Sequence, residues 1–244
     1  MSELIHYQNP PSIVDAASVV GKKEHEGPLG DCFDMHSEDD RFYQDSWEQS
    51  ESEMQRLALN LALSKQKKNP KEVEALFAGD LINQCTSSAY GLLDYPIPYF
   101  GLYGACSTAA ESLILASMTI DGGFYRTTAA VTSSHNLSAE RQFRYPVEYG
   151  GQRTPTSQWT VTGAAAYLLE QDGEGPYITE VLPGISADPG ITDINNMGAA
   201  MAPAAVDTLD RYFRLSGRDP DSFDLIVTGD LGYEGHSIVC DLMQ

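Results

Sequence analysis

Apolar and polar positions alternate along the chain with the periods of helices and buried strands. Met54, Leu57 and Leu61 recur at the spacing of one helical face, which predicts a helix that begins near Trp47 and ends at "KKNP". The first 45 residues are rich in Gly, Pro and Asp, so we expect one or two short strands and then an extended loop. The acidic cluster "HSEDDRFYQD" in this region is typical of a solvated face.

Continuous apolar runs mark the strands. They occur in "VEALFAGDL", "IPYFGLYG", "TTAAVTSSHN" and "TVTGAAAYLLEQDGEG", and runs of this kind are typical of buried strands. Between Ser107 and Asp121 the apolar residues cover most of a helical circumference, so we expect a helix that is covered on all sides. A strand, a buried helix and a second strand form a βαβ unit, and the sequence therefore predicts an α/β fold with a sheet covered on both faces.

A helix–turn–strand pattern occurs twice, about 150 residues apart. The matching pairs are Leu59 with Leu209, Leu63 with Phe213, Pro70 with Pro220, and Asp80 with Asp230. Each copy predicts an amphipathic helix, a turn with proline, and a buried strand that ends in Gly-Asp-Leu. The shared Gly-Asp-Leu favours an internal duplication over coincidence, so we expect two similar halves whose equivalent strand ends converge.

The duplication sets the expected domain boundaries. Residues 1–178 form the first half and residues 179–244 the beginning of the second. No segment after the second Gly-Asp-Leu matches "YGACSTAAESL" of the first half, so we expect the second half to be incomplete in this chain.

Charge and composition exclude several classes of function. The chain of 244 residues carries 15 basic and 35 acidic residues, a formal net charge of −20. Such a surface argues against binding to nucleic acid or to anionic lipid, because both require clustered Lys and Arg. The N-terminus does not have the pattern of a signal peptide, and no apolar run is long enough for a transmembrane helix. The four cysteines form no C-x-x-C pair and no zinc pattern, so we expect reduced thiols and no metal site.

Cys106 is the main candidate for chemistry, because it follows a predicted strand and precedes a predicted helix. The N-terminus of a helix stabilises a thiolate and binds a carboxylate, and Ser107 and Thr108 are candidate caps there. A buried free cysteine also serves as a small apolar residue, so a packing role is the alternative. His135 ends another predicted strand and is the candidate base or ligand contact, but a histidine at a strand end is often only packed and hydrogen-bonded.

Several segments resemble the stage V sporulation protein AD family. They are "FAGDLINQ", "LYGACSTAAES", "IDGGF", "TSSHNLSAERQFRYPVEYGGQ", "TVTGAAA", "NMGAAMAPAAVDT" and "DLIVTGDLG". The resemblance implies a thiolase-like fold related to ketoacyl synthases, a duplicated five-layered α/β/α/β/α sandwich that usually forms a homodimer. In the condensing enzymes of this fold the cysteine at the position of Cys106 is acylated. Their catalytic histidine corresponds to Asp230, which argues against Claisen chemistry.

The resemblance implies binding in place of catalysis. The expected ligand is dipicolinic acid, pyridine-2,6-dicarboxylate, or its calcium chelate, and no other cofactor is expected. The expected ligand-binding residues are Cys106, His135, Asp80, Gln84, Asn136 and Asp230. The family is associated with uptake of dipicolinic acid into developing spores and its release in germination. The resemblance therefore implies a peripheral subunit at the spore inner membrane, in a channel complex with other stage V sporulation A membrane proteins.

Two alternatives stay open. One is a thiolase-like acyltransferase or condensing enzyme that uses Cys106 with His135 as base. The other is an assembly subunit whose former active site has lost its function.

Overall fold

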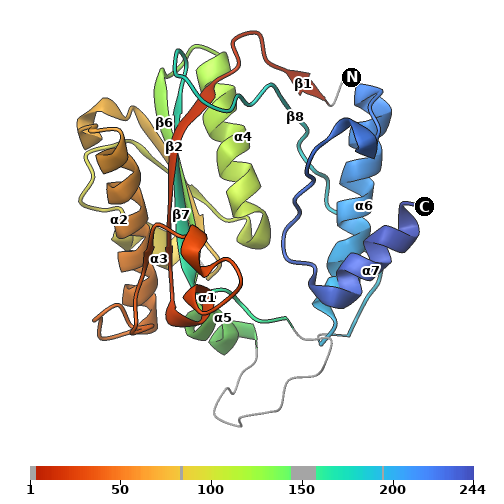
Figure 1. Cartoon of the computed structure of the whole chain (residues 1–244), viewed down its shortest axis with the longest axis horizontal. Coiled ribbons are helices and arrows are strands. Elements are labelled where there is room, and N and C mark those ends of the chain that lie inside the picture. The colour runs from red at the N-terminus through yellow and green to blue at the C-terminus, as the bar shows by residue number, and fades with distance from the viewer. Residues whose placement is uncertain (1–3, 83–84, 144–157, 194) are drawn as a thin grey trace. The chain divides into compact units, whose positions relative to one another are not determined.

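The computed structural model describes residues 4–82, 85–143, 158–193 and 195–244 (Figure 1). The chain divides into two compact units. The larger unit comprises residues 7–148 and 160–179, and the smaller unit comprises residues 1–6, 149–159 and 180–244. Within the described ranges, no helix combines the length and the apolar character that crossing a bilayer requires.

The larger unit is built on a mixed sheet of six strands in the order β3-β2-β7-β6-β4-β5. The strands are β2 (Ser12–Val20), β3 (Met35–His36), β4 (Ala75–Asp80), β5 (Tyr99–Leu102), β6 (Thr127–Ser134) and β7 (Gly163–Glu170). β4 runs parallel to β5 and β6, whereas β7 runs antiparallel to β2 and β6. The nine-residue β2 lies inside this sheet, so the first 45 residues contribute more to the fold than the expected short strand or two.

Helices cover both faces of this sheet, as the sequence predicts. The helices of this unit are α1 (Lys22–His25), α2 (Trp47–Lys65), α3 (Thr86–Gly91), α4 (Thr108–Asp121) and α5 (Asn136–Phe143), and α2 and α4 make most of the contacts with the strands. Figure 1 shows α2 and α4 on opposite sides of the strands. Among its described residues, the larger unit has two hydrophobic cores, one on each face of the sheet. Successive side chains of β4 point to opposite faces, so Leu76 and Ala78 lie in the core with α2, and Ala75 and Phe77 lie in the core with α4.

Two expectations about burial are wrong. α4 is not covered on all sides, because its buried residues form one stripe and Met118 is 37% exposed. β5 is not a buried strand: in the described part of the chain it lies at the edge of the sheet and pairs with β4 alone, and Tyr99 and Phe100 are exposed. In both cases the apolar composition was a poor guide, because burial depends on which elements lie next to the segment.

The smaller unit contains a two-stranded pair and two helices. β1 (Ile5–His6) pairs antiparallel with β8 (Glu180–Val181), and α6 (Met197–Ser216) packs against α7 (Gly232–Leu242). The close approach of these helices requires glycine, since a Cβ at Gly198 would overlap the carbonyl oxygen of Leu231.

The second copy of the repeat is formed only in part. A 3₁₀ turn at Pro220–Ser222 follows α6, as the turn at Pro70–Glu72 follows α2. The strand expected after it is wrong, because residues 223–230 form no strand and Leu225 and Val227 are 76% and 78% exposed. A strand needs neighbouring strands to satisfy its N–H and C=O groups, and no other described segment pairs with this one.

Candidate functional site

Asp80 lies where the parallel strands β4 and β6 end together, directly across from Ser133 in the strand register. Its carboxylate is only 1% exposed, and Oδ2 accepts hydrogen bonds from both the backbone N–H and the hydroxyl of Ser88, each at 2.7 Å. Its other oxygen, Oδ1, is buried without a hydrogen-bond partner in the described part of the chain. Burial raises the pKa of Asp80 above its ordinary value, against these hydrogen bonds.

A second buried carboxylate, Glu51 on α2, faces the same strand ends. Oε1 accepts a hydrogen bond from Ser133 at 2.8 Å, and Oε2 accepts hydrogen bonds from Ser138 at 2.9 Å and Ser87 at 3.3 Å. Burial raises the pKa of Glu51 to about 7, and the nearby charge of Asp80 adds to the rise.

The sequence analysis did not find Glu51 or its neighbour Gln55. Gln55 donates through Nε2 to Ser133 and to the carbonyl oxygen of Gly79, so it belongs to the same buried cluster. The two polar residues are one helical turn apart and lie on the face of α2 that also buries Met54. The sequence signal for these two residues is a pair of polar side chains, one turn apart, on the apolar face of a predicted helix.

Cys85 lies near the carboxylates of both Asp80 and Glu111. Its thiol donates a hydrogen bond to the carbonyl oxygen of Leu102 at 2.9 Å. Burial raises the pKa of the Cys85 thiol, and the carboxylates of Asp80 and Glu111 add to the rise. Glu111 lies in the first turn of α4, so the end of β4 and the beginning of α4 lie within electrostatic reach of one thiol.

Cys106 is exposed in the 3₁₀ turn (Ala105–Ser107) that leads into α4. Ala105, just before it, has a left-handed backbone with φ of 48°, which is uncommon for a residue other than glycine. The expectation that Ser107 caps the helix is wrong, because its hydroxyl donates to the carbonyl oxygen of Gly104 at 2.8 Å. No side chain in the described residues caps α4, but the 3₁₀ turn before it bonds the N–H groups of Ser107 and Thr108 to the carbonyl oxygens of Gly104 and Ala105. An anion at this helix N-terminus would therefore bind N–H groups other than these two.

His135 and Asn136 hold the beginning of α5. His135 is 1% exposed, its Nδ1 accepts a hydrogen bond from the Leu137 N–H at 3.2 Å, and its Nε2 lies 2.9 Å from the carbonyl oxygen of Asp40. This pair of bonds requires the neutral ring with the proton on Nε2, and burial lowers the pKa of His135 accordingly. Asn136 donates from Nδ2 to the carbonyl oxygen of Thr160 at 3.0 Å. These contacts favour the packed, hydrogen-bonded alternative for His135.

Asp230 lies in the smaller unit, so it is described apart from Asp80 and Cys106. It is exposed, and Oδ1 accepts a hydrogen bond from the Gly232 N–H at 2.9 Å at the beginning of α7. Gln84, another expected ligand contact, lies outside the described residues. Among the residues that are described, no three His, Cys, Asp or Glu side chains form a group suited to a metal ion.

Comparisons with known proteins place the chain in a family. A family model described as stage V sporulation protein AD (SpoVAD) matches residues 2–244. The chain belongs to this family. Stage V sporulation protein AD of Bacillus subtilis (strain 168) is 42% identical over 238 residues, which is 98% of this chain and 70% of the relative. The family is named for a role in sporulation, and its name describes no enzymatic activity.

Solved structures confirm the thiolase-like fold. A 3-oxoacyl-(acyl carrier protein) synthase III from Xanthomonas oryzae pv. oryzae KACC10331 matches with a TM-score of 0.65 and 14% identity, over 98% of this chain and 82% of its own. A cerulenin-bound OleA from Xanthomonas matches with a TM-score of 0.67 and 14% identity, over 99% of this chain and 81% of its own. At this level of identity the likeness establishes the fold and leaves the chemistry open.

Proposed function

We propose that this sporulation protein binds dipicolinic acid as its calcium chelate, without catalysis, at the beginning of α4. The observation that carries the proposal is the helix N-terminus beside the exposed Cys106, which no side chain in the described residues caps. Backbone N–H groups at such an end bind a carboxylate, and dipicolinate is a planar dicarboxylate.

The charge of the site favours the chelate over the free acid. The chain has a formal net charge of −20, and Glu111 lies in the first turn of α4 itself. A free dianion would meet these negative charges, whereas the one-to-one calcium chelate is neutral and presents a hard cation to carboxylate oxygens. Glu111 is the first proposed oxygen ligand of the calcium ion. Asp80, whose Oδ1 has no hydrogen-bond partner in the described residues, is the second.

Condensing chemistry with Cys106 is the weaker alternative. A thiol nucleophile requires a base, and both ring nitrogens of His135 already take part in hydrogen bonds, Nδ1 with Leu137 on α5 and Nε2 with the carbonyl oxygen of Asp40. Asp230, which by the family resemblance corresponds to the condensing-enzyme histidine, accepts a hydrogen bond from the backbone N–H of Gly232. An acyl adduct on Cys106 after incubation with acyl-coenzyme A, detected by intact-protein mass spectrometry, would favour the enzyme instead.

Calorimetric titration with dipicolinate, with and without equimolar Ca²⁺, tests the proposal. We expect the chelate to bind more tightly than the free acid, and we expect Glu111→Gln to weaken the chelate while strengthening the free acid. Cys106→Leu should weaken both by about tenfold, because it places a bulky group over the N–H donors. Cys32→Ser, which changes another exposed thiol of the larger unit, is the matched control and should have no effect. Absence of binding heat for both ligands would contradict the proposal.

We further propose that the chain forms a homodimer through β5. This strand is the edge of the sheet, and Tyr99 and Phe100 on it are 39% and 43% exposed. An exposed apolar edge is a template for pairing with a second copy. Sedimentation of the chain as a monomer at tens of micromolar concentration would contradict the dimer.

The proposed place of action is the spore inner membrane, as a peripheral subunit beside other stage V sporulation A membrane proteins. With a net charge of −20 the chain is unsuited to anionic lipid, so its attachment would depend on protein partners. Recovery of the chain in the spore membrane fraction, and its loss from that fraction when the integral partners are deleted, is the expected result.

A further inference from the structure

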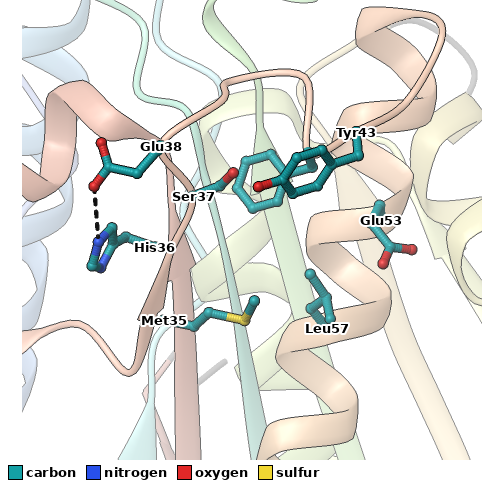
Figure 2. Close-up of a pocket in the computed structure, with 8 residues that line it drawn as sticks. Met35, His36, Ser37, Glu38, Tyr43, Glu53 and Leu57 are labelled. Carbon is teal, nitrogen blue, oxygen red and sulfur yellow. Dashed lines mark ion pairs between the residues drawn. The ribbon is translucent and has the colours of Figure 1, made fainter.

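A surface cavity of about 350 Å³ opens in the larger unit between α2 and the loop that follows β3. It is lined by Met35, His36, Ser37, Glu38, Phe42, Tyr43, Glu53 and Leu57. Figure 2 shows Tyr43 on one side of this space, with Met35 and Leu57 on the other. The volume lies at the lower end of the range for small-molecule sites, and none of the described Lys or Arg residues lines it.

The cavity does not belong to the cluster around Glu51 and Asp80. Glu53 and Leu57 are one helical turn apart on α2, and each follows a member of the buried pair Glu51 and Gln55 by two residues. Two residues correspond to about 200° around a helix, so the two pairs lie on different sides of α2.

The loop of residues 39–44 positions Tyr43 at the cavity. Phe42 is 4% exposed and packs in the core with α2, whereas Tyr43 is 87% exposed at the rim of the cavity. Both residues have left-handed backbones, with φ of 49° and 60°. Backbone hydrogen bonds of 2.8 Å from Phe42 to Asp39 and from Gln44 to Arg41 hold the loop in this conformation. The tyrosine ring therefore projects from an anchored turn.

The charge around the cavity is negative. Residues 35–57 contain seven acidic residues and two basic ones. Among the described residues, the ion pairs of Glu38 are long and exposed, at 3.5 Å to His36 and 3.9 Å to Lys22. Glu53 binds Arg56 with oxygen–nitrogen distances of 2.5 and 2.7 Å, so Glu38 is the carboxylate with the weaker existing partners. This field attracts cations and repels anions such as free dipicolinate.

We propose that this cavity is a binding site for a small organic ammonium ion. Tyr43, Glu38 and Glu53 line the same cavity, so an ammonium group in it would be attracted by the aromatic ring through cation–π interaction and by the carboxylates through Coulomb interaction. Met35 and Leu57 supply polarisable and aliphatic surface for the alkyl groups that such an ion carries. A hydrated inorganic cation would leave this apolar surface unused, and a neutral apolar molecule would leave the carboxylates unused. The organic cation is the ligand class that uses both.

Nuclear magnetic resonance of the full chain with ¹³C-labelled methionine methyl groups tests the proposal. The chain has seven methionines, and Met35→Leu assigns the Met35 signal by its loss. We expect choline to shift the Met35 methyl signal saturably, with a Kd on the order of 1 mM for a ligand of this size. Sodium chloride at equal ionic strength should not reproduce the shift. The neutral isostere 3,3-dimethyl-1-butanol should bind at least about fivefold more weakly, because it lacks the charge.

Variants of Tyr43 at the rim distinguish a site specific for cations from a cavity that binds any apolar molecule. Tyr43→Leu should weaken choline binding about fivefold or more, whereas Tyr43→Phe, which keeps the aromatic face, should change it less than about twofold. Tyr90→Leu removes an exposed tyrosine on α3 that does not line the cavity, and it should leave choline binding unchanged. Equal binding of choline and its neutral isostere, or of Tyr43→Leu and Tyr43→Phe, would overturn the proposal. Absence of a saturable Met35 shift would overturn it as well.

Discussion

The two copies of the repeat have nearly the same local structure but differ in their strands. In the first copy α2 leads through the turn Pro70–Glu72 into β4, whose six residues are all buried. In the second copy α6 leads through the turn Pro220–Ser222 into residues 223–230, which form no strand. The helix, the turn and the Gly-Asp-Leu sequence are therefore not sufficient to produce a strand.

The features that the copies share are set by neighbouring residues. Asn69 and Asp219 both form capping boxes at their 3₁₀ turns. Asp80 and Asp230 both accept a hydrogen bond from a backbone N–H near the beginning of the next helix, from Ser88 and Gly232 respectively. The capping boxes and the Asp230–Gly232 contact span two or three residues, so they form locally, whereas the Asp80–Ser88 contact spans eight residues.

The strand, which only the first copy forms, depends on residues that are distant in the sequence. β4 pairs with β5 on one side and β6 on the other, and these strands supply both its hydrogen bonds and its burial. Residues 223–230 have no such neighbours among the described residues. The comparison shows that β4 is held by its neighbours in the sheet, and paired substitutions in the two copies test this directly.

The largest contrast is expected for Gly79→Ala and Gly229→Ala. A Cβ at Gly79 would overlap the carbonyl oxygen of Leu102 on β5 and lie 2.8 Å from Thr108, whereas a Cβ at Gly229 would meet no atom within 4 Å. We expect Gly79→Ala to destabilise the larger unit by about 3 kcal/mol, because the strands must move apart. Gly229→Ala should change stability by less than about 0.5 kcal/mol.

Hydrogen exchange by mass spectrometry measures this contrast within each unit. Peptides that cover β4 should exchange much faster in Gly79→Ala, and peptides that cover residues 223–230 should be fast already in the unchanged chain. Equal effects of the two substitutions would show that the second segment is packed like the first.

The comparison also explains which parts of the fold follow from sequence. The end of β4 at Asp80 and the extent of α4 match the expected positions, and the glycines from Gly122 mark the end of α4 locally. The exposure of β5 and the absence of a strand before Asp230 did not follow, because both depend on which segments lie alongside. The thiolase-like fold was identified from the family resemblance, and pattern alone predicted only its α/β class.

The candidate site followed from sequence to a smaller degree. The position of Cys106 at the entry to α4 was predicted, but Glu51 and Cys85 were missed because they lie 55 and 21 residues before it. Such distant groups come together only when α2 and α3 pack on the strand ends. His135 was chosen because it ends a strand, and its hydrogen bonds to Leu137 and Asp40 could not be read from that position.

A smaller contrast is expected in the pH dependence of the two units. The pKa of Glu51 is raised from 4.5 to about 7 in the folded chain. The folded chain therefore binds more protons than the unfolded chain between these values. The stabilisation of the folded state by protonated Glu51 is fully present below pH 4.5 and is lost as the pH rises through about 7. We expect the larger unit to lose roughly 2 kcal/mol between pH 5 and 8 from this group, and the raised pKa of Asp80 acts in the same direction.

Glu51→Gln should remove most of this loss, because an amide keeps an acceptor for the serine hydroxyls without a titrating proton. The equivalent position on α6 is Met201, so the smaller unit should not share this effect. Urea unfolding followed by Trp47 fluorescence in a Trp159→Phe background reports on the larger unit at each pH. A pH profile that Glu51→Gln leaves unchanged would assign the dependence to another group.

The smallest contrast is expected for Asp80→Asn and Asp230→Asn. Both aspartates accept a backbone N–H near the start of a helix, but Asp80 is 1% exposed and also binds the Ser88 hydroxyl, whereas Asp230 is exposed. An amide keeps one acceptor oxygen and places an NH₂ group where Oδ1 now lies without a partner. In the buried position this should cost roughly 1 kcal/mol, and in water less than about 0.5 kcal/mol. If the two substitutions cost the same, local capping explains both aspartates, and the buried setting of Asp80 adds nothing to its contribution to stability.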